Sequence, residues 1–417
     1  MLKKMVYFLP FFCLSRISAE ESLNLRDFYA KAGVSGELRA LYQYNSQYEY
    51  LDGKSGTSNT GVLGGKVSLT SGNVYGFDAV LSGYGAFRGF EDKNKVEVDY
   101  LNNGRGNADY SLLGESFVRY TKDSDFIQIG RFGLDTPLLN SDDVRMTPDF
   151  FEGVHASVKM LDAFILDGGY IDAIAGWENL GDNAKFENIG DAIDLSGNFS
   201  GGYHVGKSSI IFAGVTFADE KNLFNFRVYD YLTQKVMNQL YMESSFKADI
   251  YELGAQYLRS VSDSRLENFG GNDIIDSTAY GLRGCVNLNK VGFTLAYDEV
   301  LKRKNTLFDG GTPDFFGGAN DPFFTSMDLL VPNQLGGVKV YKGEISYTPT
   351  DDFSLSVAHA LFHKGDGYDQ SESDLTLKAT LYKNIEADMK LSSLNETDSI
   401  GNVTTNNRVR ALLKMKF

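Results

Sequence analysis

The sequence predicts an all-β protein: a transmembrane antiparallel up-and-down β-barrel of about 18 strands, with short periplasmic turns and long extracellular loops. Three observations lead to this class. Apolar residues recur at every second position, which is the period of a strand with two different faces. Short turns and long polar loops alternate along the chain. The composition combines 44 Gly, 24 Tyr and 30 Phe with only 7 Pro, which favours extended structure.

The first residues predict export. The segment MLKKMVYFLPFFCLSRISAEES has a basic start, an apolar run too short to span a bilayer, and a small-residue cleavage site that ends at Ala19. We therefore expect residues 1–19 to be a signal peptide and residues 20–417 to form a single outer-membrane barrel domain. Loss of the three cations in 1–19 would move the net charge from -15 to -18. It would leave Cys285 as the only cysteine, so no internal disulfide is expected.

The connections give the strand count. Short turns are expected near 71–73, 122–124, 161–162, 206–208, 247–249, 289–290, 349–352 and 383–384, and long loops near 45–61, 87–111, 132–152, 172–197, 218–238, 259–277, 300–337, 363–373 and 394–404. These seventeen connections join eighteen strands. A closed barrel pairs every backbone group in lipid and leaves no edge.

The chain also ends in a way that suits a barrel. In RVRALLKMKF, apolar residues occupy every second position up to the aromatic carboxyl terminus, Phe417. Such an ending resembles the signal read by the outer-membrane barrel-assembly machinery. A soluble β-sandwich or β-solenoid is the alternative, and alternation alone does not exclude it.

We expect location in the bacterial outer membrane, in contact with lipid and lipopolysaccharide, as a monomer or a trimer. The acidic balance argues against nucleic acid as a partner.

The interior of so wide a barrel cannot be filled by side chains, and residues 20–32 are too few for a plug, so we expect a water-filled pore. An Arg or Lys that faces lipid costs roughly 2–4 kcal/mol at the bilayer midplane, so basic residues within apolar alternations should face the water. Closure sets the last strand beside the first, and Lys378 is expected on strand 17. The predicted set, called the basic wall here, comprises Arg39, Lys66, Arg131, Lys378, Arg408, Arg410 and Lys414.

The third long loop, about 132–152, interrupts the alternation with many charges: GRFGLDTPLLNSDDVRMTPDFFEGV. We hypothesise that it folds into the pore as a constriction, with its acids across the gap from the basic wall, because opposed charges would create a transverse field. An ordinary solvated surface loop is the alternative. The predicted constriction residues are Asp135, Asp142, Asp143, Arg145, Asp149 and Glu152.

This stretch resembles the loop-three region of the OprD porin family in its GR, TP, D-x-R and P-x-x-F/E-G-V succession, and VSGELRALY is similar to that family's first strand. The wording NSDDVRM-PDFF resembles Hof-type outer-membrane proteins of Helicobacter. The resemblance implies an eighteen-stranded barrel, an inward third loop and a basic ladder that faces an acidic pocket. It also implies passive diffusion of small hydrophilic solutes such as amino acids, peptides or carboxylates.

Other activities find less support. No catalytic residues, metal site or cofactor are expected: HALFH at 359–363 is not a helical zinc motif, and no nucleophile–base pair can be assembled. An enzyme is therefore not predicted. The remaining alternative is a surface adhesin or interaction protein, in which the barrel only anchors long outer loops.

Overall fold

The computed structural model describes residues 29–49, 55–91, 109–141, 143, 145–161, 163–175, 185–195, 204–219, 221, 223–269, 274–312, 322–332, 336–365, 369–397 and 403–417. The predicted signal peptide at 1–19 lies outside the described residues, and so does Asp142.

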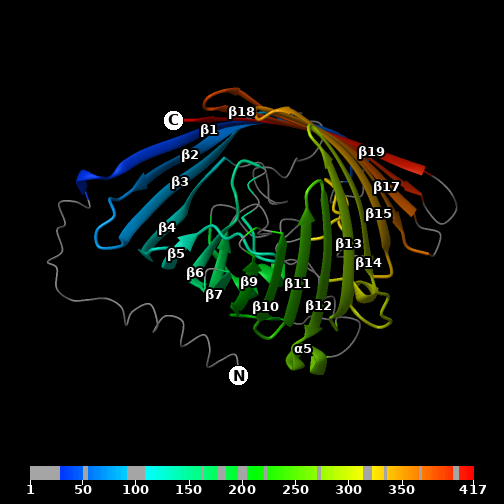
Figure 1. Ribbon diagram of the computed structural model, residues 1–417, viewed down its shortest axis with the longest axis horizontal. Coiled ribbons are helices and arrows are strands. Elements are labelled where there is room, and N and C mark those ends of the chain that lie inside the picture. Colours follow the sequence, from blue (N-terminus) through cyan, green and yellow to red (C-terminus); the bar gives the residue numbers. More distant parts are fainter. Residues whose placement is uncertain are drawn as a thin grey trace.

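Eighteen antiparallel strands of the described chain curl into one closed ring (Figure 1), which confirms the predicted fold class. Each strand pairs with its neighbours in sequence, and β19 returns to pair with β1. The two-residue β8 (Glu187–Asn188) pairs with the end of β7 and lies outside the ring. No helix of the described residues is long and apolar enough to cross a membrane.

The strands in ring order are β1 (Gly33–Glu49), β2 (Ser55–Thr70), β3 (Phe77–Glu91), β4 (Tyr110–Lys122), β5 (Asp125–Phe132), β6 (Phe150–Met160), β7 (Phe164–Ala175), β9 (Ile210–Ala218), β10 (Phe224–Thr233), β11 (Met237–Ala248), β12 (Tyr251–Ser262), β13 (Asp276–Leu288), β14 (Val291–Val300), β15 (Lys339–Thr350), β16 (Phe353–His363), β17 (Asp369–Tyr382), β18 (Ile385–Thr397) and β19 (Val403–Lys416). Three short helical elements accompany them, α4 (Ile189–Leu195), α5 (Ser264–Phe269) and η2 (Leu307–Gly310).

The alternation of the sequence becomes the two faces of this wall. On β1, Leu38 is 53% exposed on the outer face while its neighbour Arg39 is 3% exposed on the inner face. The same contrast recurs around the ring, where outward leucines such as Leu295 are 73% exposed. An apolar exterior with polar side chains inside is what a barrel in lipid requires.

Two predicted connections near the middle of the chain are wrong, although their errors cancel in the strand count. The turn at 206–208 implied a strand before it, but β7 pairs directly with β9 over eight residue pairs and leaves that strand no place in the ring. The expected long loop at 218–238 contains β10 instead. Its polar residues hid the alternation: Asn225 and Arg227 lie on the inner face with Tyr229, as the wet interior allows, and Asp230 interrupts the apolar outer face.

Two connections run inside the ring. One follows β5 and spans 133–149, and it is called loop three here (Figure 1). The other follows β14 and spans 301–338, of which 301–312, 322–332 and 336–338 are described, and it is called loop seven here. Both contact inward-facing side chains of distant strands, so they occupy the interior that the strands themselves leave open.

Candidate lumenal site

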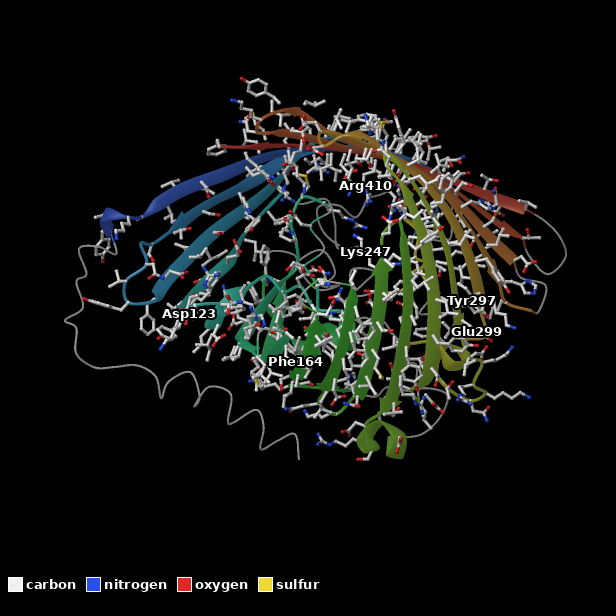
Figure 2. The ribbon with its side chains drawn as sticks, viewed as in Figure 1. Asp123, Phe164, Lys247, Tyr297, Glu299 and Arg410 are labelled. Atoms are coloured by element: carbon white, nitrogen blue, oxygen red, sulfur yellow. The ribbon has the colours of Figure 1, made fainter. Side chains whose placement is uncertain are left out.

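A cluster of cations lines the inner face where the ring closes. The register places Arg39 of β1 opposite Lys414 of β19, and Arg410 beside Lys390 of β18. Arg408 lies two residues before Arg410 on β19, so both side chains are on the same face. We call Arg39, Lys390, Arg408, Arg410 and Lys414 the inward cation cluster. In Figure 2, Arg410 points into the interior of the ring.

Loop three binds one end of this cluster through Asp143. The guanidinium of Arg39 donates two hydrogen bonds to the Asp143 carboxylate, at 2.5 and 2.8 Å, and a third at 2.7 Å to the carbonyl of Arg145. Arg39 also bonds Glu37 of its own strand at 2.5 Å. The ammonium of Lys414 donates to the Asp143 carbonyl at 3.0 Å. Such paired, charge-assisted bonds fix geometry as well as charge.

Apolar contacts anchor the next residues of loop three. Met146 is 1% exposed and packs into a cluster with Leu41, Val62, Ala86 and Leu412, which lie on four strands around the seam. The following residue, Thr147, hydrogen-bonds the hydroxyl of Tyr110 on β4. Within five successive positions, the loop is therefore held to the wall by the ion pairs of Asp143 with Arg39 and Lys414, by one buried thioether and by one hydroxyl.

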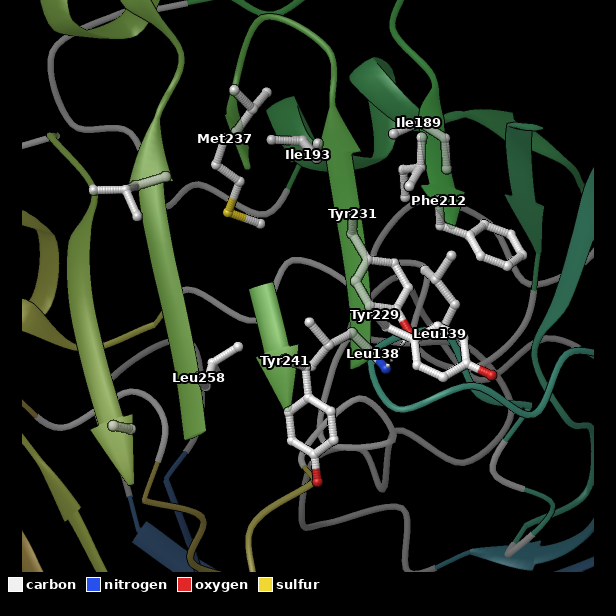
Figure 3. Close-up of a cluster of buried hydrophobic side chains, with 14 of the residues drawn as sticks. Leu138, Leu139, Ile189, Ile193, Phe212, Tyr229, Tyr231, Met237, Tyr241 and Leu258 are labelled. Carbon is white, nitrogen blue, oxygen red and sulfur yellow. Dashed lines mark hydrogen bonds between the residues drawn. The ribbon is translucent and has the colours of Figure 1, made fainter. Parts of the chain in front are cut away.

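The first half of loop three packs against the opposite side of the ring. Leu134, Leu138 and Leu139 belong to a buried cluster with residues of β5 to β12 and with Ile189 and Ile193 of α4 (Figure 3). The hydroxyl of Tyr231 on β10 accepts a hydrogen bond from the Leu138 amide at 3.3 Å. Since β10 is the ninth strand of the ring and β19 the eighteenth, loop three bridges nearly opposite walls.

Loop seven binds the other end of the cation cluster through Asp328. Its carboxylate contacts Arg410 at 2.7 Å, and both Arg408 and Lys390 at 3.3 Å. Ser392 donates a further hydrogen bond at 3.0 Å. The Asp328 side chain is 3% exposed. One loop carboxylate is thus enclosed by three cations of the barrel wall.

The backbone around Asp328 is held as firmly. The amides of Leu329 and Leu330 donate to the two oxygens of Glu372 at 2.8 Å each. The amide of Asp328 donates to Asp374 at 3.1 Å. Three residues earlier, the amide and hydroxyl of Thr325 both donate to Asp298 of β14 at 2.7 Å. Loop seven is therefore seated on strands β14 to β19.

The two loop carboxylates keep their charge. Burial opposes ionisation of Asp328, but Arg410, Arg408 and Lys390 outweigh it and hold the pKa of Asp328 well below its usual range. Burial likewise opposes ionisation of Asp143, and the hydrogen bond and charge of Arg39 together with Lys414 lower its pKa. Opposite charges within a few ångströms produce this direction of shift.

The remaining predicted site residues fall in several places. Lys66 faces inward on β2, with its ammonium 5.8 Å from the centre of the Tyr84 ring. Lys378 lies on β17, the sixteenth strand of the ring and not the seventeenth, and lines a lumenal cleft with Asp388 and Lys414. Arg131 stands apart from the cluster: it binds Glu152 at 2.7 Å and lies over the Phe186 ring at 4.2 Å.

The loop-three acids are also divided, which corrects the expectation of an acidic face across the gap from the basic wall. Asp143 does not face the cations across an open gap; it contacts Arg39 and Lys414 directly. Asp149 is 0% exposed, and Glu152 lies on β6, paired with Arg131. Asp135 accepts a hydrogen bond from Asn140 within the loop at 3.4 Å. Arg145 contributes its carbonyl to Arg39.

Sequence reasoning missed Lys390 and Asp328. Lys390 was detectable, because Glu386, Asp388 and Lys390 alternate with Ala387 and Met389 along β18. Asp328 had no comparable signal, since nothing in the surrounding PFFTSMDLLVP distinguishes an inward loop from an outward one. Among the described residues, no group of His, Cys, Asp and Glu side chains could hold a metal ion.

Comparisons with known proteins agree with this architecture. The chain resembles the crystal structures of Pseudomonas aeruginosa OccK9 (OpdG), with a TM-score of 0.75, 14% identity, and coverage of 94% of this chain and 100% of that one. It also resembles Acinetobacter baumannii OccAB2, with a TM-score of 0.72, 15% identity, and coverage of 94% and 99%. At such identities the likeness shows the fold alone.

The search of curated proteins gave no match. The family model described as outer membrane porin, OprD family, matches residues 22–322, which is most of the chain. Members of this family are porins of the outer membrane, so this protein is a channel and not an enzyme. The chain belongs to the OprD family of outer membrane porins.

Proposed function

We propose that this porin allows passive, charge-influenced diffusion of small hydrophilic solutes, namely amino acids, peptides or carboxylates. The observation that carries the proposal is the seating of Asp143 and Asp328 on the inward cation cluster. Two loops thereby narrow an eighteen-stranded ring whose interior the wall side chains would not fill. Size selection comes from the loops, and charge selection comes from the groups that remain around them.

The loop carboxylates set how strongly the cations act on a solute. Asp143 offsets Arg39 and Lys414, and Asp328 offsets Arg408, Arg410 and Lys390. A passing carboxylate therefore meets cations that are partly neutralised, and it is attracted without being held tightly. Conduction requires binding that is favourable enough for entry and weak enough for exit.

One related structure, that of Pseudomonas aeruginosa OpdK, was determined with vanillate. Vanillate is a carboxylate, which supports testing carboxylates first on this chain. Liposome swelling would test the proposal: proteoliposomes should swell in isosmotic glycine, glutamate and benzoate faster than protein-free liposomes do. Swelling no faster than that of protein-free liposomes would reject a diffusion pore and favour a barrel that anchors outer loops for adhesion.

Assembly and kinship are part of the same proposal. We infer that Phe417 is read by the barrel-assembly machinery; its backbone exchanges two hydrogen bonds of 2.9 Å with Gly36 at the closing seam. The segment NSDDVRM of loop three supports a relationship with Hof-type proteins. Residues 1–19 are proposed as the signal peptide, and a monomer or a trimer suits the pore equally.

A further inference from the structure

A second recess opens into the lumen, away from the inward cation cluster. It measures about 480 Å³ and is lined by residues of β4 to β10, with Gly133, Leu134 and Asp135 of loop three on one side. This volume is within the range of small-molecule sites, roughly 300–1,000 Å³. Lining residues such as Phe126 and Ile165 lie near the ends of their strands that meet in short turns, so the recess lies on the periplasmic side of loop three.

Apolar side chains face the lumen in this recess. Ile165 is 44% exposed although it lies on the inner face, and Phe117 and Phe126 line the recess beside it. Phe126 meets the His155 ring edge-on at 5.1 Å between centroids. Exposed apolar surface in a wet interior is unfavourable for the empty barrel, and it indicates a place where the body of a solute binds.

The charged groups of the recess are mostly acidic. Its one arginine, Arg119, is already paired with Asp78 at 3.1 Å. Glu115 accepts a hydrogen bond from Tyr84 at 3.2 Å, and Asp135 adds a second carboxylate from loop three. The lining therefore presents an excess of negative charge to a solute, opposite in sign to the inward cation cluster.

The back of the recess is a fixed hydrogen-bonded group. His155 bonds Asp167 at 2.7 Å through one ring nitrogen and Gln128 at 3.3 Å through the other, and Tyr229 bonds Asp167 at 3.3 Å. A neutral His155 satisfies this pattern, with its ring N–H donated to Asp167 and its second nitrogen accepting from Gln128. The two side-chain oxygens of Asp167 are thus held at the back of the recess.

We propose that this recess binds small aromatic solutes that carry an ammonium group. The ring would pack against Phe126, Phe117 and Ile165, and the ammonium would lie among Glu115, Asp135 and Asp167. Aromatic faces and carboxylates both attract ammonium groups. The site deepens the proposed function by naming one solute class and its place, but its occupancy at equilibrium does not require conduction.

The test measures binding to the refolded full-length barrel in detergent, by ligand-observed saturation-transfer NMR titration. Phenethylamine, phenylacetate and n-butylamine serve as probes that share either the ring or the ammonium. We expect phenethylamine to bind about tenfold more tightly than either of the others, since one lost favourable contact of this kind corresponds to about that factor.

Variants assign the binding to the recess. Phe126→Ala should weaken phenethylamine binding about tenfold, and Phe126→Leu should retain the fold while losing the ring contact. Glu115→Gln with Asp135→Asn should remove the preference over phenylacetate. Phe246→Ala is the matched control, because it removes a ring that is 49% exposed on the outer face of β11, and it should leave binding unchanged.

Two results would overturn the proposal: phenylacetate binding at least as tightly as phenethylamine, or a folded Phe126→Leu barrel that binds phenethylamine as the wild type does. Either could occur in a barrel that conducts normally, so the pore function would stand. Conversely, a barrel that never conducts but binds phenethylamine through Phe126 would reject the pore and retain the site.

Discussion

The guanidinium of Arg39 and the carboxylate of Asp143 join through two hydrogen bonds of 2.5 and 2.8 Å, across 104 residues of sequence. This pair connects the first strand of the barrel to the third loop at the seam where the ring closes. It makes loop three part of the wall at that point, and it removes one cation from the open lumen.

Asp143→Asn should loosen loop three. Hydrogen bonds to charged groups contribute roughly 1.5–3 kcal/mol each, and Asp143 is half-exposed, so we expect the lower end of that range in the free energy of unfolding. A urea titration, in which gel mobility reports the folded fraction, measures this free energy of unfolding. Asp135→Asn is the control, since Asp135 contacts Asn140 of the same loop and not the wall. Equal stability of the two variants would show that Asp143 does not anchor the loop.

Asp328→Asn should increase anion selectivity. A unit charge 4 Å from a passing ion changes the ion's energy by about 1 kcal/mol in water. This energy changes the local concentration of the ion roughly fivefold. Removing this negative charge takes the carboxylate away from Arg408 and Arg410 and leaves Lys390 with Asp374 alone, so the reversal potential in a salt gradient should move toward that of chloride. Asp249→Asn, in the turn between β11 and β12, should not move it. Equal reversal potentials for the two variants would show that Asp328 lies away from the path of the ions.

The charge effect of Asp328 should persist in mild acid. Its pKa lies below the ordinary aspartate value of 3.8. A group with a depressed pKa contributes its charge and its stabilisation fully above the ordinary value, and loses them as the pH falls through the depressed one. The difference in reversal potential between wild type and Asp328→Asn should therefore remain constant down to pH 3.8 and disappear only below it. Its loss by about pH 5 would contradict the enclosed ion pairs.

Gly36→Val should impair closure of the barrel. A Cβ at Gly36 would lie 2.3 Å from the ring of Phe417, so the terminal ring must leave the seam. Overpacking of a core costs roughly 1–3 kcal/mol, and we expect the lower end here because the displaced atoms are the tip of a ring that is 63% exposed. The folded fraction after refolding, measured by heat-modifiable gel mobility, should fall. Gly33→Val is the matched control on the same strand, because a Cβ there meets nothing within 4 Å. Equal folded fractions for both variants would show that the space at Gly36 for the Phe417 ring is not needed for closure of the barrel.

The sequence predicted the ring better than it predicted the site. Alternation and turn spacing led to eighteen strands because one false strand before residue 206 and the missed β10 cancel. The period of two placed Arg39 and Arg410 on the face opposite the lipid-facing leucines. The strand β10 was missed because Asn225 and Arg227 share its inner face with two tyrosines and Asp230 interrupts its apolar outer face. The docking of Asp143 and Asp328 depends on where two long loops lie, and no local periodicity governs a loop that packs inside a barrel.

The most direct test of the loop-narrowed, charged pore is single-channel current through the refolded protein in a planar bilayer under a salt gradient, compared with the double variant Asp143→Asn, Asp328→Asn. We predict discrete current steps from the wild type, and a reversal potential that moves toward that of chloride in the variant. A folded, inserted barrel that gives no steps, or a variant whose reversal potential matches the wild type, would contradict the account.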